Sequence, residues 1–280
     1  MEEILELIRK YTGHDNIFLT ARGNAAIWVA LKTVSLLKQG PILVQDQGGW
    51  KTFLEYPERL GLRTVQVKTG YGVIDLHDLE EKAKRAAALI YANPSGYCAG
   101  QPFHEIYEIC KRNGCFVIMD ISGCISDEYM YTADAADFFV CSFGKWKVAN
   151  AGYGGFISAR SKGFVGRLKE VIDAARLENP AIYSFDAQQQ EKVIAALQKA
   201  PERLAALYKE VGKVKYELDG FDIIHKDKMG IVVIVKYEDD TVKQQLIDYC
   251  KRNGYEYSEC PRYIRVNENA ISVEIKRLDL

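Results

Sequence analysis

Two lysines, Lys145 and Lys147, lie two positions apart in the segment CSFGKWKVANAGYGG. They stand between Ser142 and a cluster of glycines that begins at Gly152. A lysine amine becomes useful for chemistry when the protein encloses it, because it can then form a Schiff base with a carbonyl carbon. Each lysine alone is typical of a surface, so the prediction of a site depends on what else is brought beside them.

Polar residues end three of the apolar segments. Asn93 follows AALIYA, Asp120 follows CFVIM, and Ser142 follows DFFVC immediately before the lysines. In open α/β sheets, ligands bind beyond the carboxyl ends of the strands. We therefore expect Asn93, Asp120, Ser142 and one of the lysines to lie along a single rim.

A helix start faces the same rim if the first long helix packs conventionally. The segment TARGNAAI places Gly23 and Asn24 before a helix that begins at about Ala25, and helix N-termini bind phosphate groups. Pyridoxal 5′-phosphate (PLP) would use the whole set, because it carries a phosphate, a ring nitrogen, a phenolic oxygen and an aldehyde. Asp120 would hold the ring nitrogen protonated, Asn93 would donate to the phenolic oxygen, and a lysine would bind the aldehyde.

The elements that must position these residues alternate along the chain. Helical patterns at 24–39, 75–87 and 103–114 separate continuous apolar strands at 41–45, 63–68, 87–92, 115–121, 136–143 and 154–160. Continuous apolar strands between helices predict an α/β fold with a mostly parallel sheet that is sandwiched by helices.

After about residue 160 the pattern changes. A charged helical stretch runs to about 218 with breaks near Pro180 and Pro201, followed by a hairpin-like pair at 221–236, a helix at 240–254 and three short strands, EYSEC, YIRVN and ISVEIK. We expect a large domain over residues 1–162, with an N-terminal helix, and a smaller C-terminal α+β domain over residues 163–280.

Composition excludes several classes of protein. The 280 residues carry a formal net charge of -1, with no basic stripe typical of nucleic-acid binding. The seven cysteines include no C-x-x-C pair, so a zinc site has no support and no metal is predicted. There is no apolar signal segment at the start and no apolar run near the about 18 residues of a membrane span, so we expect a cytoplasmic protein.

The segment Ser142-Phe143-Gly144-Lys145-Trp146-Lys147, followed by Gly152-Tyr153-Gly154-Gly155, resembles the lysine motif of the fold-type I PLP-dependent enzymes, and most closely that of the DegT-type sugar aminotransferases. The resemblance covers roughly residues 17–160. It selects Lys147 over Lys145 as the Schiff-base lysine and Asp120 as the partner of the ring nitrogen. It also implies that Gly23, Asn24, Ala25 and Ser142 hold the phosphate, that Trp50 stacks on the ring, and that Asn93 belongs to an Asn-Pro segment.

The chain departs from that family at three points. Gly123 stands where the family usually has His or Gln, three residues after the aspartate, and Tyr153 replaces a glutamate in the glycine motif. The chain is also shorter than most relatives, with the loss after residue 160. These departures bear on the substrate and the reaction more than on the cofactor.

The resulting function hypothesis is a PLP-dependent aminotransferase that acts on a small donor and acceptor pair, an amino acid or a keto-sugar. A β-lyase or desulfurase-like reaction and a catalytically reduced PLP-binding protein stay open as alternatives. We expect a homodimer with the site at or near the interface. On the expected strand YIRVN, Arg265 is the candidate anchor for a substrate carboxylate, with Arg262 as the second candidate.

Overall fold

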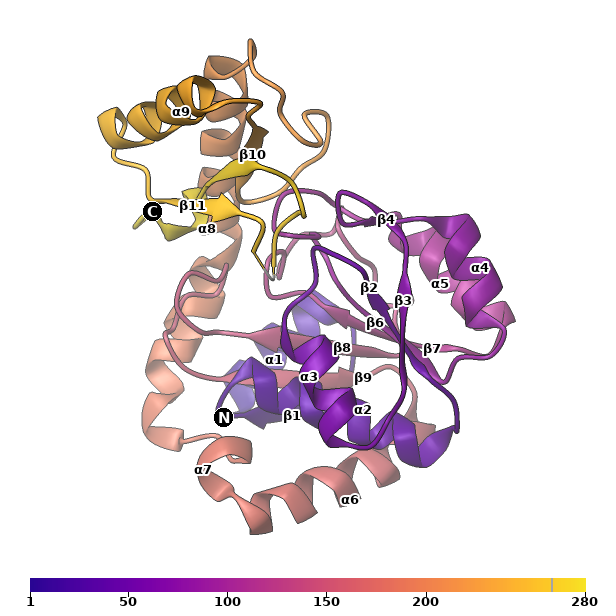
Figure 1. Cartoon of the computed structure of the whole chain (residues 1–280). Coiled ribbons are helices and arrows are strands. Elements are labelled where there is room, and N and C mark those ends of the chain that lie inside the picture. Colours follow the sequence, from indigo (N-terminus) through magenta and orange to yellow (C-terminus); the bar gives the residue numbers. More distant parts are fainter. Residues whose placement is uncertain (263) are drawn as a thin grey trace.

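The computed structural model describes residues 1–262 and 264–280. Its largest element is a seven-stranded sheet in the order β1-β9-β8-β7-β6-β2-β3 (Figure 1). Within it only β9 runs antiparallel to its neighbours. The strands are β1 (Asn16–Thr20), β2 (Ile42–Gln45), β3 (Thr64–Val67), β6 (Ala88–Ala92), β7 (Phe116–Asp120), β8 (Phe138–Ser142) and β9 (Gly155–Ala159).

Helices cover both faces of this sheet. Successive side chains of the central strands point to opposite faces, and because these side chains are apolar, both faces are buried. On β7, Val117 and Met119 belong to one hydrophobic core and Ile118 to the other. The first core is closed by α1 (Glu2–Thr12), α4 (Leu76–Ala83), α5 (Phe103–Arg112) and α8 (Gln190–Glu217). The second is closed by α2 (Gly23–Leu37), α3 (Thr52–Arg59) and α6 (Lys162–Glu178). The predicted α/β sandwich is confirmed.

A smaller sheet sits above the first in Figure 1 and contains β10 (Val233–Lys236), β12 (Ala270–Val273) and β11 (Tyr257–Cys260), in that order and antiparallel. The helix α9 (Asp240–Arg252) packs on β12, and a short 3-10 turn, η2 (Ile275–Arg277), follows it. The long helix α8 contacts both β10 and α1 and so joins the two sheets. The remaining short elements are β4 (Thr69–Gly70), β5 (Val73–Ile74), α7 (Pro180–Tyr183) and η1 (Ala187–Gln189).

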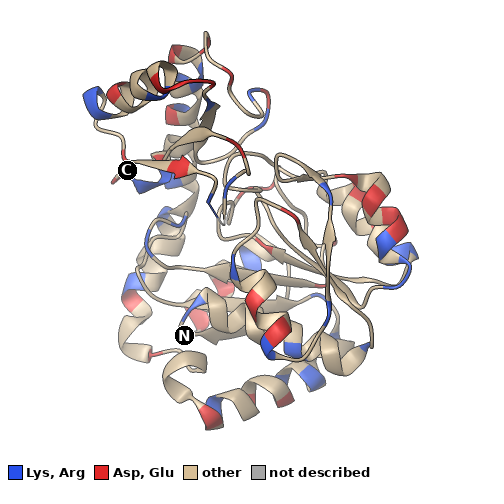
Figure 2. Cartoon of the chain, in the orientation of Figure 1, with Lys and Arg blue, Asp and Glu red and all other residues tan. Residues whose placement is uncertain are grey.

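Charged residues lie mainly on the outer helices. Figure 2 shows acidic and basic residues interspersed along α4, α6 and α9. Within the described part of the chain, no helix combines the length and the apolar character that crossing a bilayer requires.

Four features differ from the expectations. The edge strand β1 was not expected, and its short, half-buried NIFLT sequence gives little periodic signal. The expected break at Pro201 is wrong, because α8 continues through it with Leu197, Ala200 and Leu204 buried on either side. Burial of that face offsets the hydrogen bond that a proline removes from a helix interior.

The expected hairpin at 221–236 is reduced to β10 and a single bridge between Ile223 and Val235. The intervening backbone instead pairs with the large-sheet loop that follows β6, because the N–H groups of Ile231 and Val232 both donate to the carbonyl of Tyr97. The expected strand YIRVN is also wrong for its described part, since residues 264–267 are irregular; Tyr263 lies outside the described residues.

The helix α6, assigned from the sequence to the second domain, packs against α2 and β9 of the large sheet. The domain boundary at 162–163 stays a prediction.

Candidate active site

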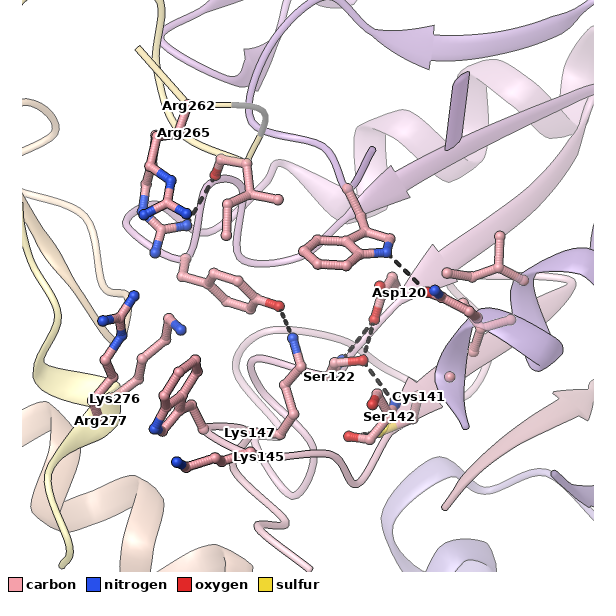
Figure 3. A pocket seen from close by; sticks show the side chains of 18 of the residues that line it. Asp120, Ser122, Cys141, Ser142, Lys145, Lys147, Arg262, Arg265, Lys276 and Arg277 are labelled. Carbon is pink, nitrogen blue, oxygen red and sulfur yellow. Dashed lines mark hydrogen bonds between the residues drawn. The ribbon is translucent and has the colours of Figure 1, made fainter. Parts of the chain in front are cut away.

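The carboxyl ends of β7 and β8, the loop after β6 and the N-terminus of α2 line one cavity of about 310 Å³ (Figure 3). Because these three strands are parallel, their last residues meet at the same edge of the sheet. The large-sheet side of the cavity is lined by six of the predicted residues: Gly23, Asn24, Trp50, Asp120, Ser142 and Lys147. The structure therefore brings Asp120, Ser142 and Lys147 of the predicted rim together, whereas Asn93 does not line this cavity.

Two glycines allow the start of α2 to approach the end of β8. A side-chain Cβ at Gly23 would lie 2.5 Å from the Cβ of Ser142, and one at Gly155 would lie 2.6 Å from the carbonyl oxygen of Cys141. Neither distance is compatible with a side chain. The close approach places the unpaired N–H groups of a helix start beside Ser142, which suits a phosphate group.

Asn24 and Trp50 hold each other on this wall. The indole Nε1 of Trp50 donates to Oδ1 of Asn24 over 2.8 Å. Ala25, predicted to bind phosphate, is buried and its N–H donates to the carbonyl of Arg22 over 3.1 Å. It does not line the cavity, so its predicted contact with phosphate stays untested.

Asp120 ends β7 and is anchored by the residues that follow it. Its Oδ1 accepts from the N–H of Ser122 at 2.9 Å and from the hydroxyl of Ser122 at 2.5 Å. That hydroxyl in turn accepts from the N–H of Ser142 over 2.8 Å. Burial raises the pKa of the Asp120 carboxyl, and the charge of Lys147 and the Ser122 bonds offset this only in part. A cation beside this carboxylate would be strongly held.

The two lysines of the motif are placed very differently. Lys145 is exposed and its Nζ lies 4.8 Å from the ring centre of Trp146, at the rim. Lys147 points into the cavity, where its Nζ donates to the hydroxyl of Tyr97 and lies 5.5 Å from the ring centre of Trp50. Burial by itself lowers the pKa of Lys147, but Tyr97 and Asp120 more than offset it, so the pKa lies above its ordinary value.

Tyr97 is the principal residue that sequence reasoning missed. It stands on the loop after β6 in a left-handed conformation with φ of 64°. A Cβ at Gly123 would lie 2.7 Å from Cδ1 of Tyr97 and 3.0 Å from Cδ of Pro94. The departure from His or Gln at Gly123 therefore leaves room for the Tyr97 ring, and that missing side chain was the available signal.

Asn93 occupies the predicted strand end, but its amide is used elsewhere. Its Nδ2 donates to the carbonyl of Met130, and its Oδ1 accepts from the N–H of Gln101 over 3.0 Å. The side chain is almost fully buried and lies outside the main cavity. Its predicted bond to a phenolic oxygen stays untested, and Tyr97 stands nearer to Lys147.

The opposite side of the cavity is formed by cations from the C-terminal region: Arg262, Arg265, Lys276 and Arg277. Arg265 is 2% exposed and binds Glu274 through both carboxylate oxygens, at 2.7 and 2.8 Å. It also donates to the hydroxyl of Ser272 over 3.0 Å. Arg265 lines the cavity as predicted, yet its guanidinium is bound to an acid of its own region; whether it also anchors a substrate carboxylate stays untested.

Glu274 is the shared counter-charge of this wall. Burial alone would raise its pKa, but Arg265, Lys276 and Arg277 hold it at about 2. Lys276 is 5% exposed, and burial lowers its pKa to about 7 even though Glu274 lies 3.4 Å from its Nζ. The cavity therefore has two lysines near the Tyr97 ring: the buried Lys276, with Nζ 5.1 Å from the ring centre, and the partly buried Lys147, at 4.7 Å.

Arg203 of α8 forms hydrogen bonds with the backbone at both Lys147 and Lys276. Its guanidinium donates to the carbonyl of Lys276 over 3.0 Å and to the carbonyl of Lys147 over 3.4 Å. Carbonyls of Leu278 and Leu280 accept further bonds. One buried side chain thus fixes the reactive loop relative to the C-terminal wall.

Comparisons with known proteins agree with this architecture. A family model described as the MJ1341 family C-terminal domain matches residues 201–280. A search of curated protein sequences finds no significant match. Among solved structures, the chain is similar to PseC of Helicobacter pylori, an aminotransferase involved in the biosynthesis of pseudoaminic acid, with a TM-score of 0.74, 13% identity, and coverage of 97% of this chain and 84% of that one.

Two further structures have comparable similarity. DesI, solved in the presence of its TDP-sugar product, gives a TM-score of 0.74 at 13% identity and covers 98% of this chain and 79% of that one. Serine palmitoyltransferase from S. paucimobilis, with a bound PLP–myriocin aldimine, gives 0.70 at 17% identity and covers 98% and 71%. The chain therefore has the fold of the fold-type I PLP-dependent enzymes.

Proposed function

We propose that this protein is a PLP-dependent aminotransferase. The observation that carries the proposal is that Lys147 and the Asp120 carboxylate line one cavity, at the edge of the sheet where α2 begins. The donor set fits the cofactor group by group: a helix start for a phosphate, a buried carboxylate for a ring nitrogen, and an enclosed amine for an aldehyde. The PLP-binding neighbours of the same fold support it.

Each residue then has a defined task. Gly23, Asn24 and Ser142 bind the phosphate, Trp50 covers a face of the ring, and Asp120 keeps the ring nitrogen protonated. When bound, PLP supplies an electron sink for a carbanion at the substrate carbon. Lys147 would hold the cofactor and, as a free amine, would carry the proton as general acid and base.

Tyr97 tunes this lysine. Its hydroxyl accepts a hydrogen bond from the Lys147 ammonium, which holds Nζ in the cavity and favours the charged form. The Asp120 charge also raises the pKa of Lys147. A cation beside Asp120 cancels that second contribution, so the pKa of Lys147 falls when the ring nitrogen occupies its place, and the neutral amine becomes available.

The substrate pair is an amino donor and a keto acceptor. PseC is involved in the biosynthesis of pseudoaminic acid, and DesI was solved with its TDP-sugar product. A keto-sugar and an amino acid are therefore the first compounds to screen. We also propose that the protein is cytoplasmic and a homodimer, the commonest closed assembly. A monomer by light scattering that still holds cofactor would refute the dimer.

The test is spectroscopic. Purified protein is loaded with PLP, its visible absorbance is recorded, and amino donors are added one at a time without an acceptor. An aminotransferase converts the bound cofactor to pyridoxamine phosphate in a single half-reaction, whereas a lyase releases a keto acid and leaves the absorbance of the aldehyde form. Failure to bind PLP at all would contradict the proposal.

A further inference from the structure

The cavity has an excess of positive charge that the cofactor does not account for. Asp120 is the single carboxylate among the described residues that line it, and the proposed function assigns that group to the ring nitrogen. Facing it are six cationic side chains: Lys145, Lys147, Arg262, Arg265, Lys276 and Arg277. Behind the wall, Glu274 is shared among Arg265, Lys276 and Arg277. Arg277 also pairs with the more exposed Glu256 at 2.5 Å, so two carboxylates face three cations and the cluster keeps a net positive charge.

Lys276 is the member of the cluster that is built for a ligand. The residue is 5% exposed, and its ammonium lies 5.1 Å from the ring centre of Tyr97. Its ion pair with Glu274 is 3.4 Å long and is not a hydrogen bond; among the described residues, none accepts a hydrogen bond from Nζ. Because Lys276 lines the cavity, the N–H donors of its ammonium remain available to an anionic ligand.

Arg277 adds a second donor at the same place. Its guanidinium stacks on Trp146, with Cζ 4.5 Å from the ring centre, and its Nε is buried without a hydrogen-bond acceptor although Glu274 lies 3.5 Å away. Figure 3 shows Lys276 and Arg277 on one side of Lys147, and Asp120 and Ser142 on the other. The two cations are therefore far from the proposed phosphate position and face the substrate side of the cavity.

We propose that the substrate of this site carries an anionic oxygen group, a carboxylate or a phosphate, that binds to Lys276 and Arg277 on the C-terminal side of the cavity. The inference rests on the proposed function and extends it to the substrate class. It also gives a reason for the charge balance of the wall: Glu274 orients the cations, and the anion completes their coordination.

Binding is coupled to protonation of Lys276. Its pKa of about 7 is set by burial and by Glu274, with Arg265, Lys147 and Arg277 opposing the charge. The charged or titratable groups packed around it are Glu274 and Arg277 on η2 and its approach, Arg265 before β12, Lys147 and Tyr97 from the large-sheet loops, and Arg203 from α8. Below the pKa Lys276 is charged and attracts the anion; above it the attraction is lost.

The experiment is a calorimetric titration of the cofactor-loaded protein with sulfate and with succinate. Sulfate represents a phosphoryl group and succinate a carboxylate, and neither changes its charge appreciably between about pH 6.5 and about pH 8.5. The anion that binds more tightly identifies the chemistry. We expect at least one of them to bind, and to bind about tenfold more weakly at the higher pH.

Three variants decide the outcome. Lys276→Gln should weaken the anion about tenfold or more at the lower pH, whereas the matched control Lys145→Gln, at the exposed rim, should have little effect. Lys276→Arg should retain binding and lose its pH dependence. Because it keeps the positive charge, this variant still tests the proposal if Lys276→Gln does not fold. The cofactor absorbance of each sample should be unchanged, since Lys276 lies away from the phosphate position.

The inference is overturned if neither anion binds the wild-type protein, if Lys276→Gln binds as wild type, or if Lys276→Arg keeps the wild-type pH profile. A loss of cofactor absorbance in Lys276→Gln would instead show that these cations hold the cofactor phosphate. If the protein takes up no PLP, the proposed function fails, and the Lys276 contrast in the same titrations still decides the anion site.

Discussion

Two lysines line one cavity, and their surroundings shift their pKa values in opposite directions. The pKa of Lys147 is raised, although burial opposes the charge, because the Tyr97 hydroxyl and the Asp120 carboxylate both favour the ammonium. The pKa of Lys276 is lowered to about 7 by burial, which Glu274 offsets only in part because that carboxylate is shared with Arg265 and Arg277. Burial is common to both, so the neighbouring charges decide the direction of each shift.

Because of this contrast, either lysine is a candidate for Schiff-base formation, which the motif alone does not reveal. A neutral amine is the nucleophile in Schiff-base formation. Of the two lysines, Lys276 loses its proton more readily before a cofactor binds. Lys147 prevails in our account because a ring nitrogen at Asp120 removes the charge that keeps it protonated, and because Lys276 has no carboxylate of its own to hold such a ring.

The largest expected effect is the loss of Lys147. Lys147→Ala should lower turnover by at least about a thousandfold, since it removes both the covalent anchor and the general base. The measurement is the rate of the half-reaction with the best donor. Lys145→Ala serves as the control, and a comparable loss in that variant would show that the wrong lysine of the pair was chosen.

Asp120→Asn should slow turnover about a hundredfold while leaving the cofactor bound, because an amide does not keep the ring nitrogen protonated. The comparison is between the cofactor dissociation constant and the single-turnover rate. Normal turnover would refute the assigned role. The variant also sharpens the comparison of the lysines, because the pKa of Lys147 should fall when the carboxylate is removed.

Glu274→Gln should lower the free energy of unfolding by about 3 kcal/mol, since breaking a buried ion cluster leaves uncompensated charges. Urea denaturation measures it, and Glu259→Gln, whose partner is the surface residue Lys243 at 2.7 Å, should cost about 0.5 kcal/mol or less. Equal losses in the two variants would show that the buried cluster is not special.

The depressed pKa of Glu274 also predicts that the protein loses stability at low pH. The folded pKa of this carboxyl, about 2, lies below the ordinary glutamate value of 4.5, so its contribution to stability is complete above about pH 4.5 and is lost as the pH falls towards about 2. In Glu274→Gln this part of the acid-unfolding profile should disappear. A profile with the same slope as wild type would assign the acid limit to other carboxylates.

The smallest effect concerns Tyr97. Tyr97→Phe should reduce turnover about tenfold by removing the hydrogen bond to Lys147, with little change in stability. Gly123→Ala should disturb the same ring by steric contact with Cδ1, and lower stability by about 1 to 3 kcal/mol. If Tyr97→Phe is indistinguishable from wild type in rate and pH profile, Tyr97 only fills space beside Lys147.

The large sheet and its rim were predictable because local signals agreed. Apolar strands ended by Asp120 and Ser142, and the glycines before α2, each have a short-range pattern, and parallel topology brings their ends together. The C-terminal wall was not predictable in the same way. Lys276, Arg277 and Glu274 stand on a short turn with no motif, and long-range contacts, such as those from Tyr97 to Ile231 and from Arg203 to Lys276, bring them to the cavity. Arg265 was found from the sequence, but its pairing with Glu274 depends on an irregular segment that was expected to be a strand.

The most direct test of the account is to trap the cofactor on its lysine. Protein loaded with PLP is reduced with borohydride, digested and mapped by mass spectrometry, with attention to the peptides that contain Lys145, Lys147 and Lys276. The account predicts a pyridoxyl label on Lys147. A label on Lys276, the lysine with the lower pKa, or on Lys145, or no label on any of them, would contradict it.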